Sequence, residues 1–198
     1  MNEFLNDLAK RRTYYGLDND ITLSRQQIQE IVEQCVLNTP SAFNSESARV
    51  VLLFGAHHEK LWQIVKDALR KIVPEAAFAP TEAKIDSFAA AAGTILYFDD
   101  MVSIAELQKQ FPTYKDHFPT WGEQANGMLQ SNIWVALTIE GLGASLQHYN
   151  PLIDDAVRKE WDIPADWKLI AQMPFGNPIL PPDPKENIPL TERIETFS

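Results

Sequence analysis

The sequence predicts an α+β fold, close to an α/β arrangement, in which helices flank one mixed sheet. Two observations support this prediction: stretches with helical spacing outnumber the short apolar runs typical of strands, and helices separate those runs. We expect a single domain over residues 1–198, because the chain has no repeat, low-complexity segment or internal linker. The proline-rich stretch 178–198 is predicted to be an extended C-terminal arm.

Helices are predicted wherever apolar residues recur at intervals of three and four. They cover residues 2–12, 24–38, 57–72, 81–92, 102–111 and 121–141. Ser24 is a good N-cap, and Pro40 stops the helix that Ser24 begins. The helix at 121–141 is apolar almost all round at its centre, which is typical of a core or an oligomer seam. Short β-rich runs predict strands at 48–54, 94–98, 144–147 and 168–174, the first of them buried.

Composition narrows the possible partners. A net charge of −10 argues against nucleic acid, since phosphate binding needs a basic field. No apolar run approaches the roughly 20 residues of a membrane span, and the N-terminus lacks the apolar core of a signal peptide. Cys35 is the only cysteine and lies at a core-facing position of a predicted helix. We therefore expect a cytoplasmic protein whose partners are small molecules or a second copy of the chain.

Several common catalytic and nucleotide-binding motifs are absent from the sequence. No GxGxxG follows a predicted strand, and GxxxxGK[ST], HExxH and GxSxG do not occur, which argues against a stable dinucleotide site. His57 and His58 open a helix without a third ligand at metal spacing, so no metal site is predicted there. Asp99 and Asp100 end a strand just before a helix, where carboxylates favour the helix N-terminus; a metal pair is the alternative.

Two polar segments carry groups suited to a phosphorylated heterocycle. Arg11, Arg12 and Thr13 follow the first helix and offer two cations and a hydroxyl, the groups that a phosphate monoester needs. Basic residues also complement the C-terminal end of a helix dipole, so this interpretation has an alternative. Asn44, in the loop 39–45, can both donate to and accept from a flat ring, although Asn is also common in turns.

Motifs spread along residues 8–194 resemble those of the nitroreductase family. The motifs, in order, are RRTYY, PSAFNSESARVV, EAKIDSFAAAAGTILYF, GLGASLQHYNP and FGNP, followed by a basic residue in the tail. The sequence looks most like the subgroup of fungal fatty-acid-repression-mutant proteins and their bacterial counterparts. The resemblance implies an intertwined homodimer that binds FMN at its interface.

The resemblance also implies roles for particular residues. Arg11, Arg12 and Thr13 would hold the FMN phosphate, while Ser41 and Asn44 of the partner chain would lie beside the isoalloxazine or ribityl group.

The remaining implied contacts come from three later segments. The backbone of Gln147 and His148 would direct an N–H toward flavin N5, and Lys185 of the tail would return to the phosphate. Lys84 would lie near the N1–C2=O edge of the flavin, where negative charge accumulates on reduction. No catalytic side chain and no metal are implied, because the flavin itself does the chemistry.

The implied reaction has two half-reactions: NADH or NADPH, a transient co-substrate, reduces the flavin, and a nitroaromatic or quinone acceptor then oxidises it. Phe43, Phe118, Trp121 and Tyr149 are candidate aromatic walls for these ligands. Two alternatives stay open: an FMN-binding redox-responsive or flavin-storage protein with little turnover, and a binding protein without flavin.

Three departures from the family pattern affect the expected site. Tyr14 and Tyr15 occupy a stretch where many members carry a second basic residue, and Glu46 stands where Gln is usual. In the tail, Asn187 takes the place of the arginine that usually follows Lys185 by two positions. Arg193 is a candidate to supply the phosphate ligand that this position does not offer.

Overall fold

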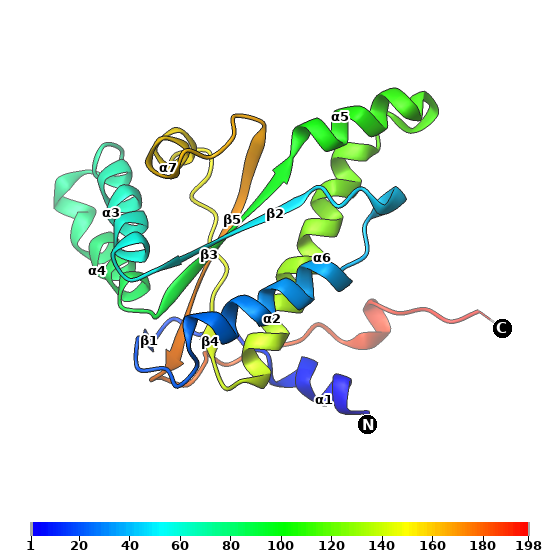
Figure 1. Ribbon diagram of the computed structural model, residues 1–198. Helices are drawn as coiled ribbons and strands as arrows, with labels where there is room; N and C mark the ends of the chain where they lie inside the picture. The colour runs from blue at the N-terminus through cyan, green and yellow to red at the C-terminus, as the bar shows by residue number, and fades with distance from the viewer. Residues whose placement is uncertain (1, 198) are drawn as a thin grey trace.

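Helices and short strands follow one another along residues 2–197, the part of the chain that the computed structural model describes (Figure 1). The helices are α1 (Glu3–Lys10), α2 (Arg25–Asn38), α3 (Ala56–Arg70), α4 (Phe78–Ala89), α5 (Met101–Gln110), α6 (Phe118–Ile139) and α7 (Asp154–Trp161). The strands are β1 (Leu17–Asp18), β2 (Ala48–Phe54), β3 (Gly93–Asp100), β4 (Gly143–Ala144) and β5 (Trp167–Pro178). The predicted α+β class is confirmed.

The sheet has the strand order β1-β5-β3-β2, and β4 also pairs with β5. All four strand pairs are antiparallel, so the predicted mixed sheet was wrong. A parallel pairing occurs at an isolated bridge between Thr13 and Ala144. Between β2 and β3 the chain forms two helices, α3 and α4, where two helices were predicted. A single crossover helix favours parallel strands, whereas the α3–α4 pair returns the chain beside Phe54, where β2 ended.

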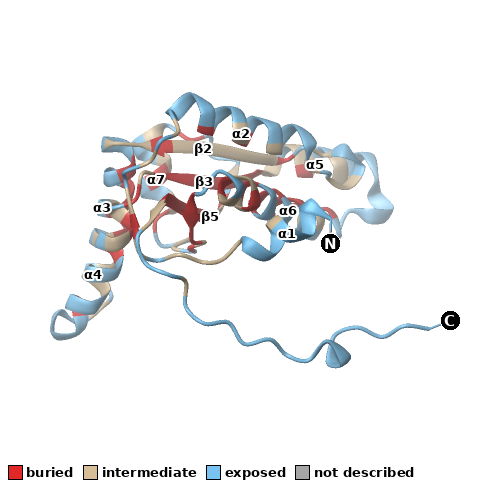
Figure 2. Ribbon diagram, turned by 90° about the horizontal axis from the view of Figure 1, so that it is seen from below, coloured by how far each residue is buried: buried red, intermediate tan, exposed pale blue. Residues whose placement is uncertain are grey.

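The central strand β3 is buried on both faces. Ile95 and Tyr97 point into a core cluster with residues of α2 and α6, whereas Leu96 and Phe98 point into a second cluster with residues of α3, α4 and α7. This alternation is the period of two expected of a strand. Helices thus cover the sheet on both faces, with α2 and α6 on one and α3, α4 and α7 on the other (Figures 1 and 2).

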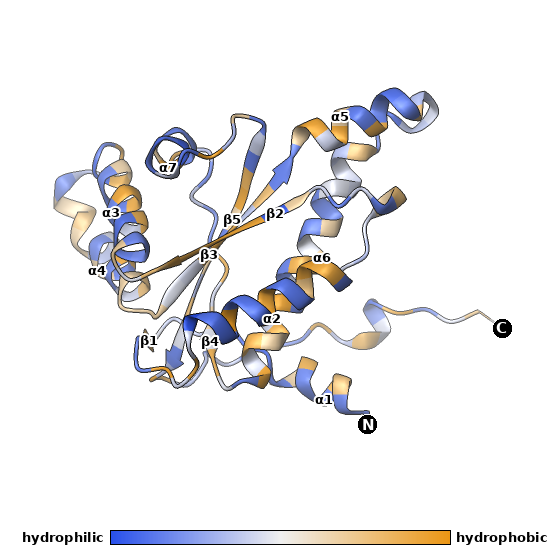
Figure 3. Cartoon of the chain, viewed as in Figure 1, coloured by the Kyte–Doolittle hydropathy of each residue, from blue (hydrophilic) through white to orange (hydrophobic). Residues whose placement is uncertain are grey.

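β2 lies at one end of the strand order and is less buried than predicted. The strand is hydrophobic along most of its length (Figure 3), yet only Leu53 is fully buried. Within residues 2–197 no strand pairs with its outer edge. An apolar edge strand left open in this way is a surface that another chain is able to cover.

Other differences from the predicted elements are local. The strand expected at 144–147 is shorter, since only Gly143 and Ala144 form β4 and a single bridge joins Gln147 to Gln172. α6 begins at Phe118, three residues before the predicted start. Sequence patterns did not predict β1 and α7, whereas they identified the N-cap of α2, where the Ser24 side chain accepts from the N–H of Gln27.

The chain beyond β5 forms an arm at the surface. Figure 2 shows residues 179–197 leaving the body of the protein, with one 3-10 turn at Leu190–Glu192. The arm exposes several large apolar side chains: Ile179, Leu180, Ile188, Leu190, Ile194 and Phe197. No helix within residues 2–197 has the length and apolarity needed to cross a membrane.

Candidate functional site

The segment after α1 brings the first predicted site residues together. The Arg11 guanidinium lies 4.5 Å from the centroid of the Trp134 ring on α6. Arg12 donates to the backbone carbonyl of Asp183 in the arm, and Thr13 bridges to Ala144 of β4. This segment therefore joins α6, β4 and the start of the arm in one place.

Lys84 lies on α4, whereas Lys185 lies in the arm. The Lys84 ammonium is 5.9 Å from the centroid of the Phe88 ring, and the Tyr15 ring lies 6.4 Å from that same ring. Phe88 thus has both Lys84 and Tyr15 as neighbours. Lys185 is exposed and comes two residues after Asp183, the residue that Arg12 holds. Arg11, Arg12, Thr13, Lys84 and Lys185 form what we call the cationic half-site.

The backbone N–H groups of Gln147 and His148 differ in their surroundings. The N–H of Gln147 donates to the carbonyl of Gln172 over 2.7 Å, and its side chain donates to Ser145 Oγ over 3.1 Å. Gln147 is buried, whereas His148 is exposed. The His148 N–H is therefore the better candidate for donation to a bound ring.

The loop that carries Ser41 and Asn44 is conformationally strained. Phe43, Asn44 and Glu46 have φ angles of 56°, 51° and 45°, in the left-handed region that non-glycine residues rarely adopt. The Ser41 Oγ accepts from the N–H of Glu46 over 3.0 Å, and the Asn44 amide donates to the Glu46 carboxylate over 2.9 Å. Such strain, about 1–3 kcal/mol per residue, is common at ligand sites, where the surrounding structure holds it in place.

Aromatic side chains surround Phe43 in this loop. Its ring lies 4.6 Å from Phe111 and is stacked on Trp121 at 6.1 Å and an interplanar angle of 18°. Phe118 and Tyr114 complete the group. Three of the four predicted aromatic walls thus lie together, whereas Tyr149 lies elsewhere, against Trp62. We call this group, together with Ser41 and Asn44, the aromatic half-site.

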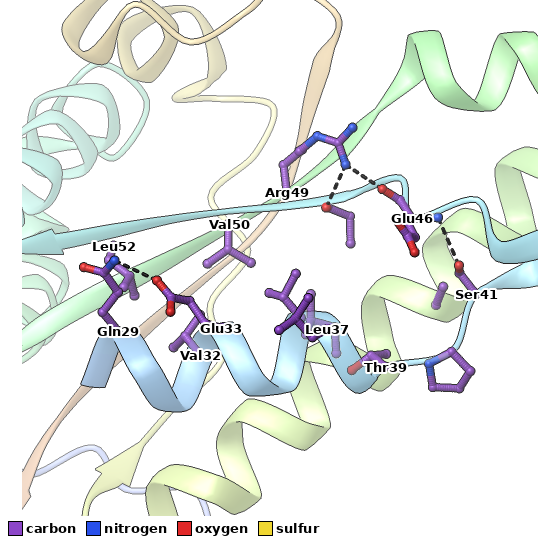
Figure 4. Close-up of a pocket in the computed structure, with 15 residues that line it drawn as sticks. Gln29, Val32, Glu33, Leu37, Thr39, Ser41, Glu46, Arg49, Val50 and Leu52 are labelled. Carbon is purple, nitrogen blue, oxygen red and sulfur yellow. Dashed lines mark hydrogen bonds between the residues drawn. The ribbon is translucent and has the colours of Figure 1, made fainter. Parts of the chain in front are cut away.

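A groove of about 770 Å³ runs between α2, β2 and α6 and reaches the aromatic half-site at Ser41 (Figure 4). Its walls are largely apolar, with Val36, Leu37, Val50 and Leu52 among them. Arg49 closes one side: its guanidinium donates to the Glu46 carbonyl over 2.5 Å and to the Asp100 carboxylate over 2.7 Å.

The two half-sites lie near opposite ends of α6. Trp121 contacts Phe43 in the aromatic half-site, and Trp134 contacts Arg11 in the cationic half-site. The two tryptophans are thirteen positions apart, which at 1.5 Å per residue places them about 20 Å apart along the helix. One copy of the chain therefore does not bring the two groups of residues together.

Buried polar residues support the sheet beneath the aromatic half-site. Asp99 is 1% exposed, and burial raises the pKa of its carboxyl, although a hydrogen bond from Asn126 over 3.0 Å opposes that rise. Burial also acts to raise the pKa of Asp100, but hydrogen bonds from Ser103 and from the N–H of Val102 outweigh it and lower that pKa. Asp100 is the N-cap of α5, as its position in the sequence predicted.

The remaining candidate side chains have structural partners. His58 is buried and bonds to Thr94 and the Ala89 carbonyl, and burial lowers its pKa. Cys35 packs against the core, and burial raises the pKa of its thiol. Within the described range, no group of three or more His, Cys, Asp or Glu side chains is arranged to hold a metal ion.

Comparison with known proteins decides the family. The family model for nitroreductases matches residues 8–177, most of the chain. The chain belongs to the nitroreductase family. This is a family of NAD(P)H-dependent flavin oxidoreductases.

The nitroreductase relatives include the predicted fungal subgroup and a bacterial counterpart. HBN1 of Saccharomyces cerevisiae is 36% identical over 93% of this chain and 93% of its own, and nitroreductase FRM2 of the same yeast is 32% identical over 92% and 91%. Nitroreductase CinD of Lactococcus lactis, in complex with nicotinic acid, is 42% identical and superposes with a TM-score of 0.92 over 99% of this chain and 100% of its own. CinD structures also contain chloramphenicol or 4-nitrophenol.

A more distant nitroreductase of Desulfovibrio desulfuricans is in complex with FMN. It shares 20% identity, covers 100% of this chain and 99% of its own with a TM-score of 0.68, and shows the fold alone.

Proposed function

We propose that this protein is an FMN-dependent oxidoreductase that transfers hydride from NADH or NADPH to nitroaromatic, quinone or similar acceptors. The observation that carries the proposal is the separation of the two half-sites at opposite ends of α6. A second copy in a twofold arrangement would place the aromatic half-site of one chain against the cationic half-site of the other. Two equivalent sites would then form at the dimer interface.

The cationic half-site fits the phosphate of FMN. Arg11, Arg12 and Lys185 supply positive charge in a chain whose net charge is −10, and the Thr13 hydroxyl adds a donor. Arginine and hydroxyl donors are typical ligands of a phosphate monoester. Lys84, beside Phe88, is the cation that would oppose negative charge on the ring.

The aromatic half-site fits flat ligands. The ring faces of Phe43 and Trp121 provide a stacking surface, and the Asn44 amide and Ser41 hydroxyl provide polar contacts at its edge. CinD binds 4-nitrophenol and chloramphenicol, which supports a small aromatic acceptor for this chain as well.

FMN, when bound, supplies hydride transfer between the two substrates. The protein's own contribution is to bind and orient the ligands. Arg11 and Arg12 would hold the phosphate, the His148 N–H would donate to the ring, and Lys84 would stabilise negative charge at the ring edge. Phe43 and Trp121 exclude water from the face where the substrates lie.

The arm and the groove support the dimer. Residues 188–197 expose Ile188, Leu190, Ile194 and Phe197, and the groove beside β2 is apolar and open in one copy. We propose that the arm of each chain covers the groove and the β2 edge of its partner. Such an exchange buries apolar surface on both chains.

A visible spectrum of the purified protein tests the proposed activity. We expect a yellow protein whose flavin absorbance bleaches on anaerobic addition of NADH or NADPH and returns on addition of 4-nitrophenol or a quinone. A yellow protein that none of the acceptors reoxidises would indicate the flavin-storage alternative. A protein that stays colourless after incubation with FMN would overturn the proposal.

A further inference from the structure

Trp134 lies directly against Arg11. The centre of the Arg11 guanidinium is 4.5 Å from the centroid of the indole, and both side chains are half-buried. The Trp134 Nε1 is itself buried and donates to no residue within 2–197. The contact that Trp134 makes at this place is therefore through its ring face, which lies against Arg11, and not through a hydrogen bond from Nε1.

The N–H donors of the Arg11 guanidinium have no acceptor among the side chains of residues 2–197. Arg12 and Arg49 donate to carbonyl or carboxylate oxygens, whereas the Arg11 guanidinium makes no ion pair or side-chain hydrogen bond in the described part of the chain. A guanidinium attracted to the face of a ring has fewer orientations available to it, and tryptophan is the strongest partner for such a contact. The N–H groups of the Arg11 guanidinium then stay available for an oxyanion. Two parallel N–H donors of a guanidinium match two oxygens of a phosphate.

We propose that Trp134 is a positioning residue that holds Arg11 for the phosphate of the flavin nucleotide. This inference rests on the proposed function and adds a consequence for specificity. Because Trp134 acts through Arg11, and Arg11 acts on the phosphate, the pair makes the site select FMN over riboflavin, which has the same ring and no phosphate. The indole is not itself a ligand of the flavin.

Binding of FMN and riboflavin to the flavin-free full-length protein tests this role. We expect Trp134→Leu to weaken FMN binding roughly three- to thirtyfold, and Trp134→Phe to weaken it less, since phenylalanine keeps a weaker ring face. Trp134→Phe also removes no hydrogen bond to residues 2–197, because Nε1 donates to none of them. Arg11→Ala should weaken FMN binding by about ten- to a hundredfold, because a charged hydrogen bond is lost, and this is the largest effect expected of the Trp134 variants.

Riboflavin binding distinguishes a Trp134 that positions Arg11 from a Trp134 that only packs against its neighbours. Its dissociation constant should change less than about twofold in all three variants, so the ratio of FMN to riboflavin affinity should fall in the order Trp, Phe, Leu. Trp161→Leu, on the opposite face of the sheet, is the matched control and should leave that ratio unchanged. Thermal unfolding of each variant checks that it is folded, and Trp134→Phe keeps the test valid if the leucine variant is not.

Three results would overturn the inference in distinguishable ways. Equal losses of FMN and riboflavin in the Trp134 variants would show that this residue only packs α6. A wild-type protein that binds neither flavin would overturn the proposed function as well. An Arg11→Ala variant with unchanged FMN affinity would remove the phosphate role on which the inference depends.

Discussion

Burial of Asp99 makes the stability of the folded chain depend on pH. Its side chain is fully enclosed between β3 and α6, with Asn126 as its hydrogen-bond donor and Ser47 Oγ nearby without a partner among residues 2–197. Burial and the charge of Glu123 raise the pKa of Asp99, while Asn126, Lys168 and Arg49 act in the other direction. At a pH between its unfolded and folded pKa values, the Asp99 carboxyl therefore keeps its proton in the folded protein and has lost it in the unfolded chain.

This difference predicts the pH dependence of an Asp99→Asn variant. A folded-state pKa above the unfolded value of 3.8 gives a stability contribution that is complete below pH 3.8 and lost as pH rises through the folded pKa. The asparagine does not ionise, so the unfolding free energy of Asp99→Asn, relative to wild type, should increase as the pH rises from about 4 through the folded pKa of Asp99. Urea unfolding across that range measures it.

The matched control for this prediction is Asp116→Asn, since Asp116 is exposed in the loop between α5 and α6. Its stability relative to wild type should stay constant over the same range. A constant difference for Asp99→Asn too would mean that the buried carboxyl ionises as readily in the folded as in the unfolded chain.

Among the elements, α2 connects a sequence signal to the site most directly. Ser24 and Gln27 form a capping box, in which Ser24 Oγ accepts from the Gln27 N–H over 3.2 Å and Gln27 accepts from the Ser24 N–H over 2.9 Å. We expect Ser24→Ala to lower the unfolding free energy by about 1 kcal/mol, because the backbone N–H of Gln27 loses the Ser24 Oγ as its acceptor. Ser131→Ala, exposed in the middle of α6, should change it by less than about 0.5 kcal/mol or raise it. If Ser24→Ala lowers the unfolding free energy no more than Ser131→Ala does, the stabilising role of the N-cap is contradicted.

The elements also show what the sequence could and could not predict. α2 and α3 have apolar positions at helical spacing, a local signal that survives folding, and both were predicted. α7 was missed because it is short and polar, with Val157 its only fully buried residue. Strand direction was predicted wrongly, since an apolar run has the same local pattern whichever way its neighbour runs.

The same limit applies to the site. Arg11 was singled out because its chemistry is visible in one residue, but the assigned phosphate role stays a prediction. Trp134, its partner in the structure, was identified only as part of an apolar helix, because their contact joins positions far apart in the sequence. Phe111 and Tyr114 were also missed, although they continue toward Phe118 and Trp121 at intervals of three and four residues.

At the scale of the whole molecule, the arm and the groove make the predicted dimer testable. Ile188 and Ile194 are 61% and 62% exposed in the arm, and burying each in a partner would contribute roughly 1.5–3 kcal/mol. We expect the wild type to be a dimer and Ile188→Asp or Ile194→Asp to weaken association by roughly tenfold or more. Sedimentation equilibrium measures the change. Ile72→Asp, at an equally exposed position (62%) after α3, is the matched control and should leave the dimer intact.

The groove side of the interface gives an independent version of this prediction. Leu37 is 76% exposed at the end of α2 and lines the groove, so Leu37→Asp should weaken the dimer as the arm variants do. Because the arm and the groove would belong to one interface, combining Leu37→Asp with Ile188→Asp should cost less than the sum of the two separate losses. FMN content should fall together with the dimer, since each site needs both chains. Dimers that persist in all these variants would place the interface elsewhere, whereas monomers that keep full FMN affinity would show that one chain completes the site alone.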